Sequence, residues 1–226
     1  MQKTVFLFLV LTFVFSCNNV KKDEPDSENQ PLTLNEMIAF AHGIEHWDEV
    51  EELHFTFNVN RGDTHSERSW IWKPKTDDVT LFRNGDTLHY NRKNLDSISL
   101  QADPGFINDK YWLLAPFNLV WDEGTTFSQK DSVRAPISNK TMQQLTVTYG
   151  DEGGYTPGDA YDFFFENDFM IKEWIFRKSN DTLPSMITTW EDYKDFDGIK
   201  IATMHQNPEG TFKLYFTNIE VITSNE

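Results

Sequence analysis

The chain has 226 residues, and 20 Lys and Arg stand against 36 Asp and Glu, which gives a formal net charge of −16 at pH 7. A protein that binds nucleic acid needs a positive contact face, and no Lys/Arg cluster supplies one, so we expect no nucleic-acid partner. The only cysteine, Cys17, excludes an internal disulfide, so an exported domain must be stable through its hydrophobic core alone.

Residues 1–16 predict a signal peptide. Lys3 is their only charge, the run from Val5 to Phe15 is almost wholly apolar, and the small residue Ser16 follows. The run is too short for a membrane-spanning helix, which needs about 20 residues. Cleavage after Ser16 leaves 19 Lys and Arg against 36 Asp and Glu, a net charge of −17.

Cys17 stands directly after this segment. The residues Val14-Phe15-Ser16-Cys17 resemble the bacterial lipobox, although Phe15 departs from the small or aliphatic residue usual at its position. The resemblance implies that Cys17 is acylated, becomes the mature N-terminus and anchors the protein to a membrane. The alternative is a plain signal peptide followed by a cysteine that is there by accident.

Residues 17–33 predict a disordered tether, because they are polar, charged and contain two prolines. The segment Lys21-Lys22-Asp23-Glu24 resembles a charged signal that directs lipoproteins of some Gram-negative bacteria to the outer face of the outer membrane. An ordinary solvated linker is the alternative. We therefore expect a lipid-anchored protein of the cell envelope, at the outer membrane, on its periplasmic or its cell-surface face.

A folded domain is expected over residues 34–226, which at about 190 residues is long enough for one sizeable core. Its first helix is predicted to begin at Leu34, because Thr33 can cap it and Glu36 completes a capping box. Apolar residues at helical spacing continue toward Trp47. The helix is expected to end before Leu53, where the pattern changes to period two.

Alternation of apolar and polar residues, bounded by turn residues, predicts antiparallel strands through most of the remaining sequence. The predicted strands cover residues 53–59, 68–72, 79–82, 87–90, 144–149, 161–165, 169–177, 186–193, 199–205 and 212–222. Residues 103–117 are densely apolar without alternation, and they predict one or two short helices inserted between the strands.

These elements predict an α+β fold. We expect a single, strongly curved antiparallel sheet, a half-barrel, with the N-terminal helix and the short helical insertion as a plug in its concave face. Strands 161–165 and 169–176 carry apolar residues on both faces, so both faces need cover.

Several segments resemble the lipoprotein-carrier fold of the periplasmic lipoprotein-sorting chaperones and their lipid-binding relatives. They are the aromatic strands of residues 161–176 and WEDYKDFDGIK at residues 190–200. AHGIEHW at residues 41–47 and DKYWLLAPF at residues 109–117 resemble a group of uncharacterised exported bacterial lipoproteins. The resemblance implies a cavity that holds acyl chains between the curved sheet and its helices, and it implies no catalytic residue.

The aromatic content is high, with 19 Phe, 7 Trp and 7 Tyr. Most of these residues are expected to fill the core of the curved sheet, and a surplus is expected to line a cavity. For any single candidate a core role is favoured. The candidate ligand-binding residues are Trp70, Trp72, Trp112, Leu113, Leu114, Phe117, Trp174 and Trp190.

We expect no metal, no cofactor and no catalytic residue. His42 and His46 have helical spacing, but the order His-Gly-Ile-Glu-His differs from the His-Glu-x-x-His of zinc proteases. The sequence contains no Gly-x-Ser-x-Gly motif, phosphate loop or dinucleotide fingerprint. The first hypothesis is therefore a binding protein for an acyl chain or other apolar small molecule. A surface carbohydrate-binding protein is second, and a hydrolase that uses Asp162, Glu166 or Glu173 is last.

Replacement of Cys17 by alanine should abolish membrane retention, because it removes the only residue that can carry the acyl anchor. Cell fractionation and incorporation of a radioactive fatty acid measure the two effects. Ser16→Ala is the control, since it keeps the cysteine and a small residue before it. A Cys17→Ala protein that stays with the membranes and takes up as much label would contradict the lipobox interpretation.

Overall fold

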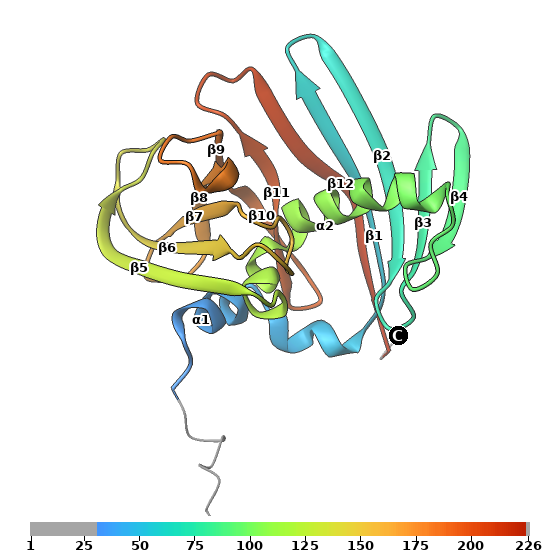
Figure 1. Cartoon of the computed structure of the whole chain (residues 1–226), viewed down its shortest axis with the longest axis horizontal. Helices are drawn as coiled ribbons and strands as arrows, with labels where there is room; N and C mark the ends of the chain where they lie inside the picture. The colour runs from blue at the N-terminus through green and yellow to red at the C-terminus, as the bar shows by residue number, and fades with distance from the viewer. Residues whose placement is uncertain (1–30, 225–226) are drawn as a thin grey trace, which may run out of the picture. The chain divides into compact units, whose positions relative to one another are not determined.

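Two antiparallel sheets and a long helix between them make up residues 31–224, the part of the chain that the computed structural model describes (Figure 1). The signal peptide, Cys17 and the tether as far as residue 30 lie outside the described residues. The helical elements are α1 (Leu34–Ala41), η2 (Ile44–Glu49), α2 (Ser99–Trp121) and η3 (Lys178–Asn180).

The larger sheet has seven strands, and the first and last strands of the chain pair within it. Its order is β10 (Glu191–Phe196), β11 (Ile199–Gln206), β12 (Phe212–Thr223), β1 (Val50–Arg61), β2 (Thr64–Lys73), β3 (Asp78–Arg83) and β4 (Asp86–Asn91). Every predicted strand in these segments is present.

The smaller sheet has five strands that follow one another in sequence. Its order is β5 (Thr125–Arg134), β6 (Thr141–Tyr149), β7 (Ala160–Phe165), β8 (Ile171–Arg177) and β9 (Met186–Thr189). The sequence did not predict β5, because its residues are largely polar and nearly all exposed, so no apolar alternation marks it.

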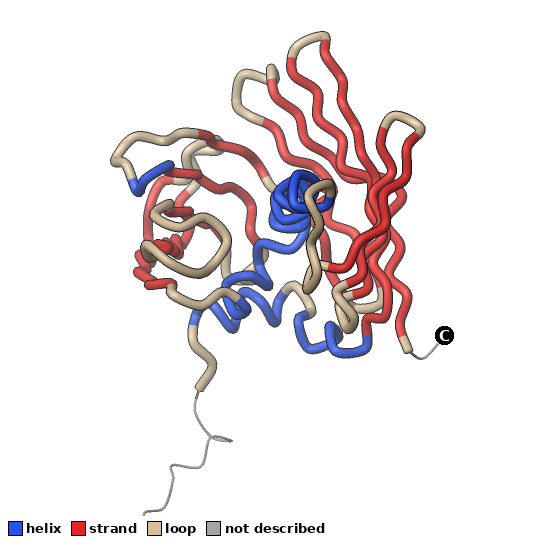
Figure 2. Tube along the Cα trace, turned by 45° about the vertical axis from the view of Figure 1, so that its right-hand side comes forward, coloured by secondary structure: helices blue, strands red, loops and turns tan. Residues whose placement is uncertain are grey.

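The predicted single sheet is divided in two at Trp190. β9 pairs with β8 through Thr189, and the Trp190 amide donates a 2.7 Å hydrogen bond to the Lys172 carbonyl. From Glu191 onward the chain is β10, which pairs with β11 instead. The continuous alternation over residues 186–193 contains no signal for this change of partner. The α+β class and the antiparallel pairing are confirmed, and the two groups of strands flank α2 (Figure 2).

The first helix begins as predicted and ends earlier. The Thr33 amide donates to Glu36 at 2.7 Å, the expected capping contact. α1 stops at Ala41 because Gly43 takes a left-handed conformation, with φ at 90°. A Cβ at Gly43 would collide with the Gly198 carbonyl, so this close approach requires glycine.

The helical insertion is one helix of 23 residues, longer than the one or two short helices predicted. It is kinked at Leu114, where φ is −125°. Pro116 causes the kink, because proline lacks a backbone N–H and its ring crowds the carbonyl of Trp112 four residues earlier. From Tyr111 to Leu119 every residue of α2 is buried, and a helix that is buried on all sides must lie between layers.

β7 is covered on both faces, as its composition predicts, and all six of its residues are buried. Tyr161 and Phe163 belong to the main core beneath α2. Phe164 faces the other way and packs in a second cluster with Ala135 and Met142, which come from the β5–β6 hairpin. The β5–β6 hairpin therefore covers the outer face of β7. The sequence analysis did not predict this role for it.

A buried ion pair fastens α2 to the larger sheet. Arg68 on β2 donates two hydrogen bonds to the Asp109 carboxylate, at 2.5 and 2.6 Å, and Trp70 Nε1 donates a third at 2.8 Å. The Asp109 side chain is fully buried. Its hydrogen bonds raise the pKa of Arg68, so the guanidinium keeps its charge. Arg92 holds Asp103 in the same helix at 2.9 Å.

Asp109→Asn should lower the free energy of unfolding by about 3–5 kcal/mol, because it leaves the Arg68 charge without its partner. Urea denaturation measures the loss. Glu51→Gln is the matched control: it neutralises one member of the half-exposed Lys75–Glu51 pair, whose atoms are 2.6 Å apart, and should cost less than about 1 kcal/mol. Equal losses in both variants would show that the buried pair does not anchor α2.

Candidate functional site

A cavity of about 540 Å³ lies between the two sheets beside α2. This volume is within the range of about 300–1,000 Å³ that is common for small-molecule sites. The lining residues are Phe57, Val59, Arg61, Ser66, Glu67, Arg68, Arg83, Asn108, Trp112, Tyr155, Thr156, Tyr161, Trp174, Phe176, Met186, Phe212 and Leu214. Most of these are apolar or aromatic, and the charged members come from β1, β2 and β3.

The wall formed by the larger sheet follows from strand alternation. Phe57 and Val59 are two residues apart on β1 and therefore share the inner face. On β12, Leu214 lies directly opposite Val59, and Phe212 opposite Arg61. These side chains form a continuous apolar surface on the inner face of paired strands.

The opposite wall is aromatic. Tyr161 on β7 lies with its ring centroid 5.0 Å from Phe176 and 5.1 Å from Trp174, both on β8. Trp112 on α2 meets Trp174 edge-on at 4.4 Å. This wall therefore consists of rings fixed by mutual contacts, which preserves the shape of the cavity without a ligand.

The loop that follows β6 closes one side. Tyr155 stacks on Tyr111 of α2, with centroids 3.7 Å apart and planes at 4°. Its hydroxyl donates to Asn108 Oδ1 at 3.2 Å. Desolvation raises the pKa of Tyr155 and of Tyr161, so both phenols stay neutral.

The structure brings two of the candidate ligand-binding residues to the cavity, Trp112 and Trp174. The other six are buried in the core outside the lining: Trp70, Trp72, Leu113, Leu114, Phe117 and Trp190. Sequence analysis missed Phe57, Val59 and the residues of β12. Their alternation marks an inner face, but no local signal shows which part of that face the helix leaves uncovered.

His205 lies in the core behind this aromatic wall. Its ring centroid is 4.5 Å from Trp190 and 5.3 Å from Trp112, and its Nδ1 contacts the Thr189 carbonyl at 3.1 Å. Burial lowers the pKa of His205 to about 3, so the ring is neutral at pH 7. Among residues 31–224 its Nε2 has no hydrogen-bond partner. His205 therefore packs as an aromatic side chain.

The two helical histidines lie in different environments. His42 is buried, its Nδ1 contacts the Ile38 carbonyl at 2.7 Å, and its Nε2 contacts the Tyr193 hydroxyl at 3.1 Å. Burial lowers the pKa of His42 to about 4. His46 is half-exposed. Within the described part of the chain, no three His, Cys, Asp or Glu residues are grouped as a metal site would require.

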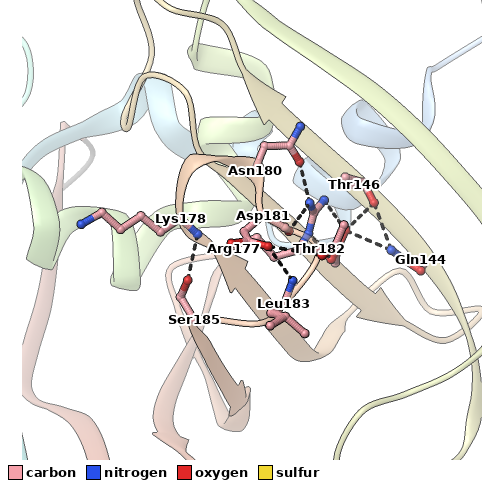
Figure 3. A network of polar contacts seen from close by, with 10 residues as sticks. Gln144, Thr146, Arg177, Lys178, Asn180, Asp181, Thr182, Leu183 and Ser185 are labelled. Carbon is pink, nitrogen blue, oxygen red and sulfur yellow. Dashed lines mark hydrogen bonds and ion pairs between the residues drawn. The ribbon is translucent and has the colours of Figure 1, made fainter.

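The strand carboxylates on the outer face of the smaller sheet have structural partners. Asp162 accepts hydrogen bonds from Arg177 at 2.9 Å and from Gln144 at 3.0 Å. Figure 3 shows that Arg177 also reaches Asn180 and the carbonyl of Asp181.

Glu173, the other buried acid of this sheet, accepts the backbone N–H groups of Ile137 and Ser138 at 2.7 and 2.9 Å. Glu166 is exposed, and its carboxylate is 4.0 Å from Lys140 Nζ. None of these acids lines the cavity, so they do not form a carboxylate pair across it.

Solved structures are similar to this chain. A LolA superfamily protein from Nitrosomonas europaea matches with a TM-score of 0.52 at 10% sequence identity, over 85% of this chain and 94% of that chain. A DUF1329 family protein from Desulfovibrio piger matches with a TM-score of 0.47 at 10% identity, over 84% and 92%. An outer membrane lipoprotein-sorting protein domain from Vibrio parahaemolyticus has a TM-score of 0.45 at 10% identity, over 86% and 95%.

The fold is therefore LolA-like, and the resemblance to the lipoprotein-carrier fold is confirmed at the level of architecture. No protein-family model matches the sequence, and the search of curated proteins finds no relative. At 10% identity the likeness defines the arrangement of the elements alone.

The neutral state of His205 gives the protein a specific pH dependence. An unfolded histidine has a pKa of about 6.5. Between that value and a folded pKa of about 3, the unfolded state binds a proton that the folded state does not. The contribution of His205 to stability is therefore complete above about pH 6.5 and is lost as the pH falls toward 3, by about 1.4 kcal/mol per pH unit.

His205→Phe should remove this term. Urea denaturation at pH values between about 6 and 4.5 measures how the unfolding free energy changes with pH. The slope should be steeper for the parent than for His205→Phe by about 1.4 kcal/mol per pH unit, which corresponds to one proton. His42 and the carboxylates titrate in both proteins and cancel in the difference. Identical slopes would show that His205 is charged in the folded state.

Proposed function

We propose that this protein binds an acyl chain or a similar apolar small molecule in the cavity between its sheets. The cavity of about 540 Å³ is the observation that carries the proposal. Where the lining is aromatic and aliphatic, water finds few hydrogen-bond partners, so an apolar ligand that displaces it there gains the hydrophobic free energy of both surfaces. The LolA-like fold supports a binding role rather than a catalytic one.

The wall is suited to a flexible chain. Tyr161, Trp174 and Phe176 offer ring faces, and Met186 contributes a flexible, polarizable thioether at the start of β9. A buried methylene group contributes about 0.8 kcal/mol, so each further methylene that enters the cavity should strengthen binding about fourfold.

We propose further that the protein is a lipid-anchored component of the cell envelope, at the outer membrane. The placement of Cys17 after an apolar segment supports this proposal. Within residues 31–224, no helix is both long and apolar enough to cross a bilayer. In this arrangement the acyl anchor on Cys17 would hold the domain at the membrane, and the domain would receive or hold its ligand there.

The carbohydrate-binding alternative required tryptophans exposed in a row. All seven tryptophans lie in the described part of the chain, and five of them are buried. Trp47 and Trp121 are half-buried and pack against the core, with their centroids 5.0 Å apart. An apolar ligand in the cavity is therefore better supported than a sugar on the surface. The strand carboxylates do not line the cavity, so they give the hydrolase alternative no support.

Val59→Trp should abolish binding, because its larger side chain extends into the space where the chain would lie. The neutral fluorescent probe 1-N-phenylnaphthylamine reports occupancy in the full chain carrying Cys17→Ala. Small-to-large substitutions in packed cores lower the free energy of unfolding by about 1–3 kcal/mol. Val59→Trp should lower it by less, because the cavity has room for the larger side chain. The folded state is checked by urea denaturation.

Val133→Trp is the matched control, since it makes the same substitution in the second cluster, on the outer face of the smaller sheet. It should bind the probe like the parent. The proposal fails if the parent does not bind the probe. It fails equally if Val59→Trp stays folded and binds as before.

A further inference from the structure

Three arginines lie on the wall of the cavity that the larger sheet forms. Arg61 is the last residue of β1, Arg68 lies on β2, and Arg83 is the last residue of β3. All three line the cavity. Arg61 follows Phe57 and Val59 at intervals of two, so it lies on the same inner face of the strand.

In the part of the chain that the structure describes, two of these charges have no counter-ion. Arg68 is neutralised by Asp109, as described above. Within residues 31–224, neither Arg61 nor Arg83 forms an ion pair or a side-chain hydrogen bond. The Arg61 guanidinium lies over the Phe212 ring, 5.3 Å from its centroid. Its charged group is therefore held at the cavity while its donors are free.

These positive charges contrast with the net charge of the whole chain, which is −16. Glu67 is the only acid among the lining residues, and its carboxylate is 3.4 Å from His65 Nε2. On an acidic protein, two unpaired arginines beside an apolar cavity provide a local attraction for anions.

We infer that the ligand is an anionic single-chain amphiphile. Its apolar tail occupies the aromatic part of the cavity, and its carboxylate or phosphate head binds Arg61 and Arg83. This inference rests on the proposed function, because it assigns the head group of the same ligand. The planar guanidinium fork matches both carboxylate and phosphate in geometry, and hydrogen bonds between charged partners are about twice as strong as neutral ones.

A neutral lipid fits the site formed by Arg61 and Arg83 less well. Its binding would cover the two guanidinium groups and remove part of their hydration without supplying a counter-ion, which is unfavourable. The head-group charge should therefore decide affinity among ligands with the same tail.

The test compares dodecanoate, dodecyl phosphate and dodecanol, which differ only in the head group. Each competes with 1-N-phenylnaphthylamine for the full chain carrying Cys17→Ala, below micelle-forming concentrations. We expect both anions, or one of them, to bind at least about tenfold more tightly than the alcohol. The preferred anion identifies the head group. Added salt should reduce the difference in affinity between the anions and the alcohol, because it screens exposed charges.

The double variant Arg61→Gln/Arg83→Gln should lose about tenfold in affinity for the anion and stay within about twofold for dodecanol. Arg134→Gln is the control, since it removes an exposed arginine of β5 outside the cavity and should change neither affinity.

The outcomes separate the two proposals. If dodecanol binds the parent as tightly as the anions, or if the double variant keeps the anion affinity, the inference about the head group is overturned and the proposed function stands. If neither the probe nor any of the three ligands binds, the proposed function itself fails.

Discussion

The structure depends on the burial of one helix between two sheets. From Tyr111 to Leu119, α2 has no side that can face water, so it is stable only where both sheets contact it. Hydrophobic contact alone would allow such a helix to slide, because apolar contacts have no preferred direction. The Arg68–Asp109 pair fixes the position of the helix on the sheet, because a carboxylate that accepts two hydrogen bonds from one guanidinium allows only one relative orientation of the two side chains.

The cavity exists because the strands of the larger sheet are longer than the width of the helix that crosses them. β1 has 12 residues and spans about 40 Å, whereas a helix that crosses it covers about 10–12 Å of that length. Figure 1 shows α2 lying across the strands of the larger sheet, with β1, β2 and β12 extending beyond it. The inner face of those strands keeps its apolar alternation past the helix, and the smaller sheet encloses it from the other side.

Local patterns predicted the elements far better than their partners. The strands with one apolar face, such as β1 and β12, were predictable because alternation is written in the sequence itself. The division at Trp190 was not, since it depends on which strand lies beside each half of a continuous segment. The candidate site shows the same limit: Trp112 and Trp174 line the cavity, while Trp70 and Trp190 are core residues with the same composition and spacing signals.

Position relative to α2 therefore decides which aromatic residues of the core also line the cavity. Phe55 and Phe57 share one face of β1, and both contact Phe216, at 6.0 and 5.8 Å. Phe55 is wholly enclosed in the core, whereas Phe57, two residues farther along, belongs to the same core and also lines the cavity. Arg68 stands opposite Phe57 at this boundary, with its guanidinium 5.4 Å from the Phe57 ring. One residue thus holds the helix and borders the cavity, so the contact that stabilises the fold also sets where the cavity begins.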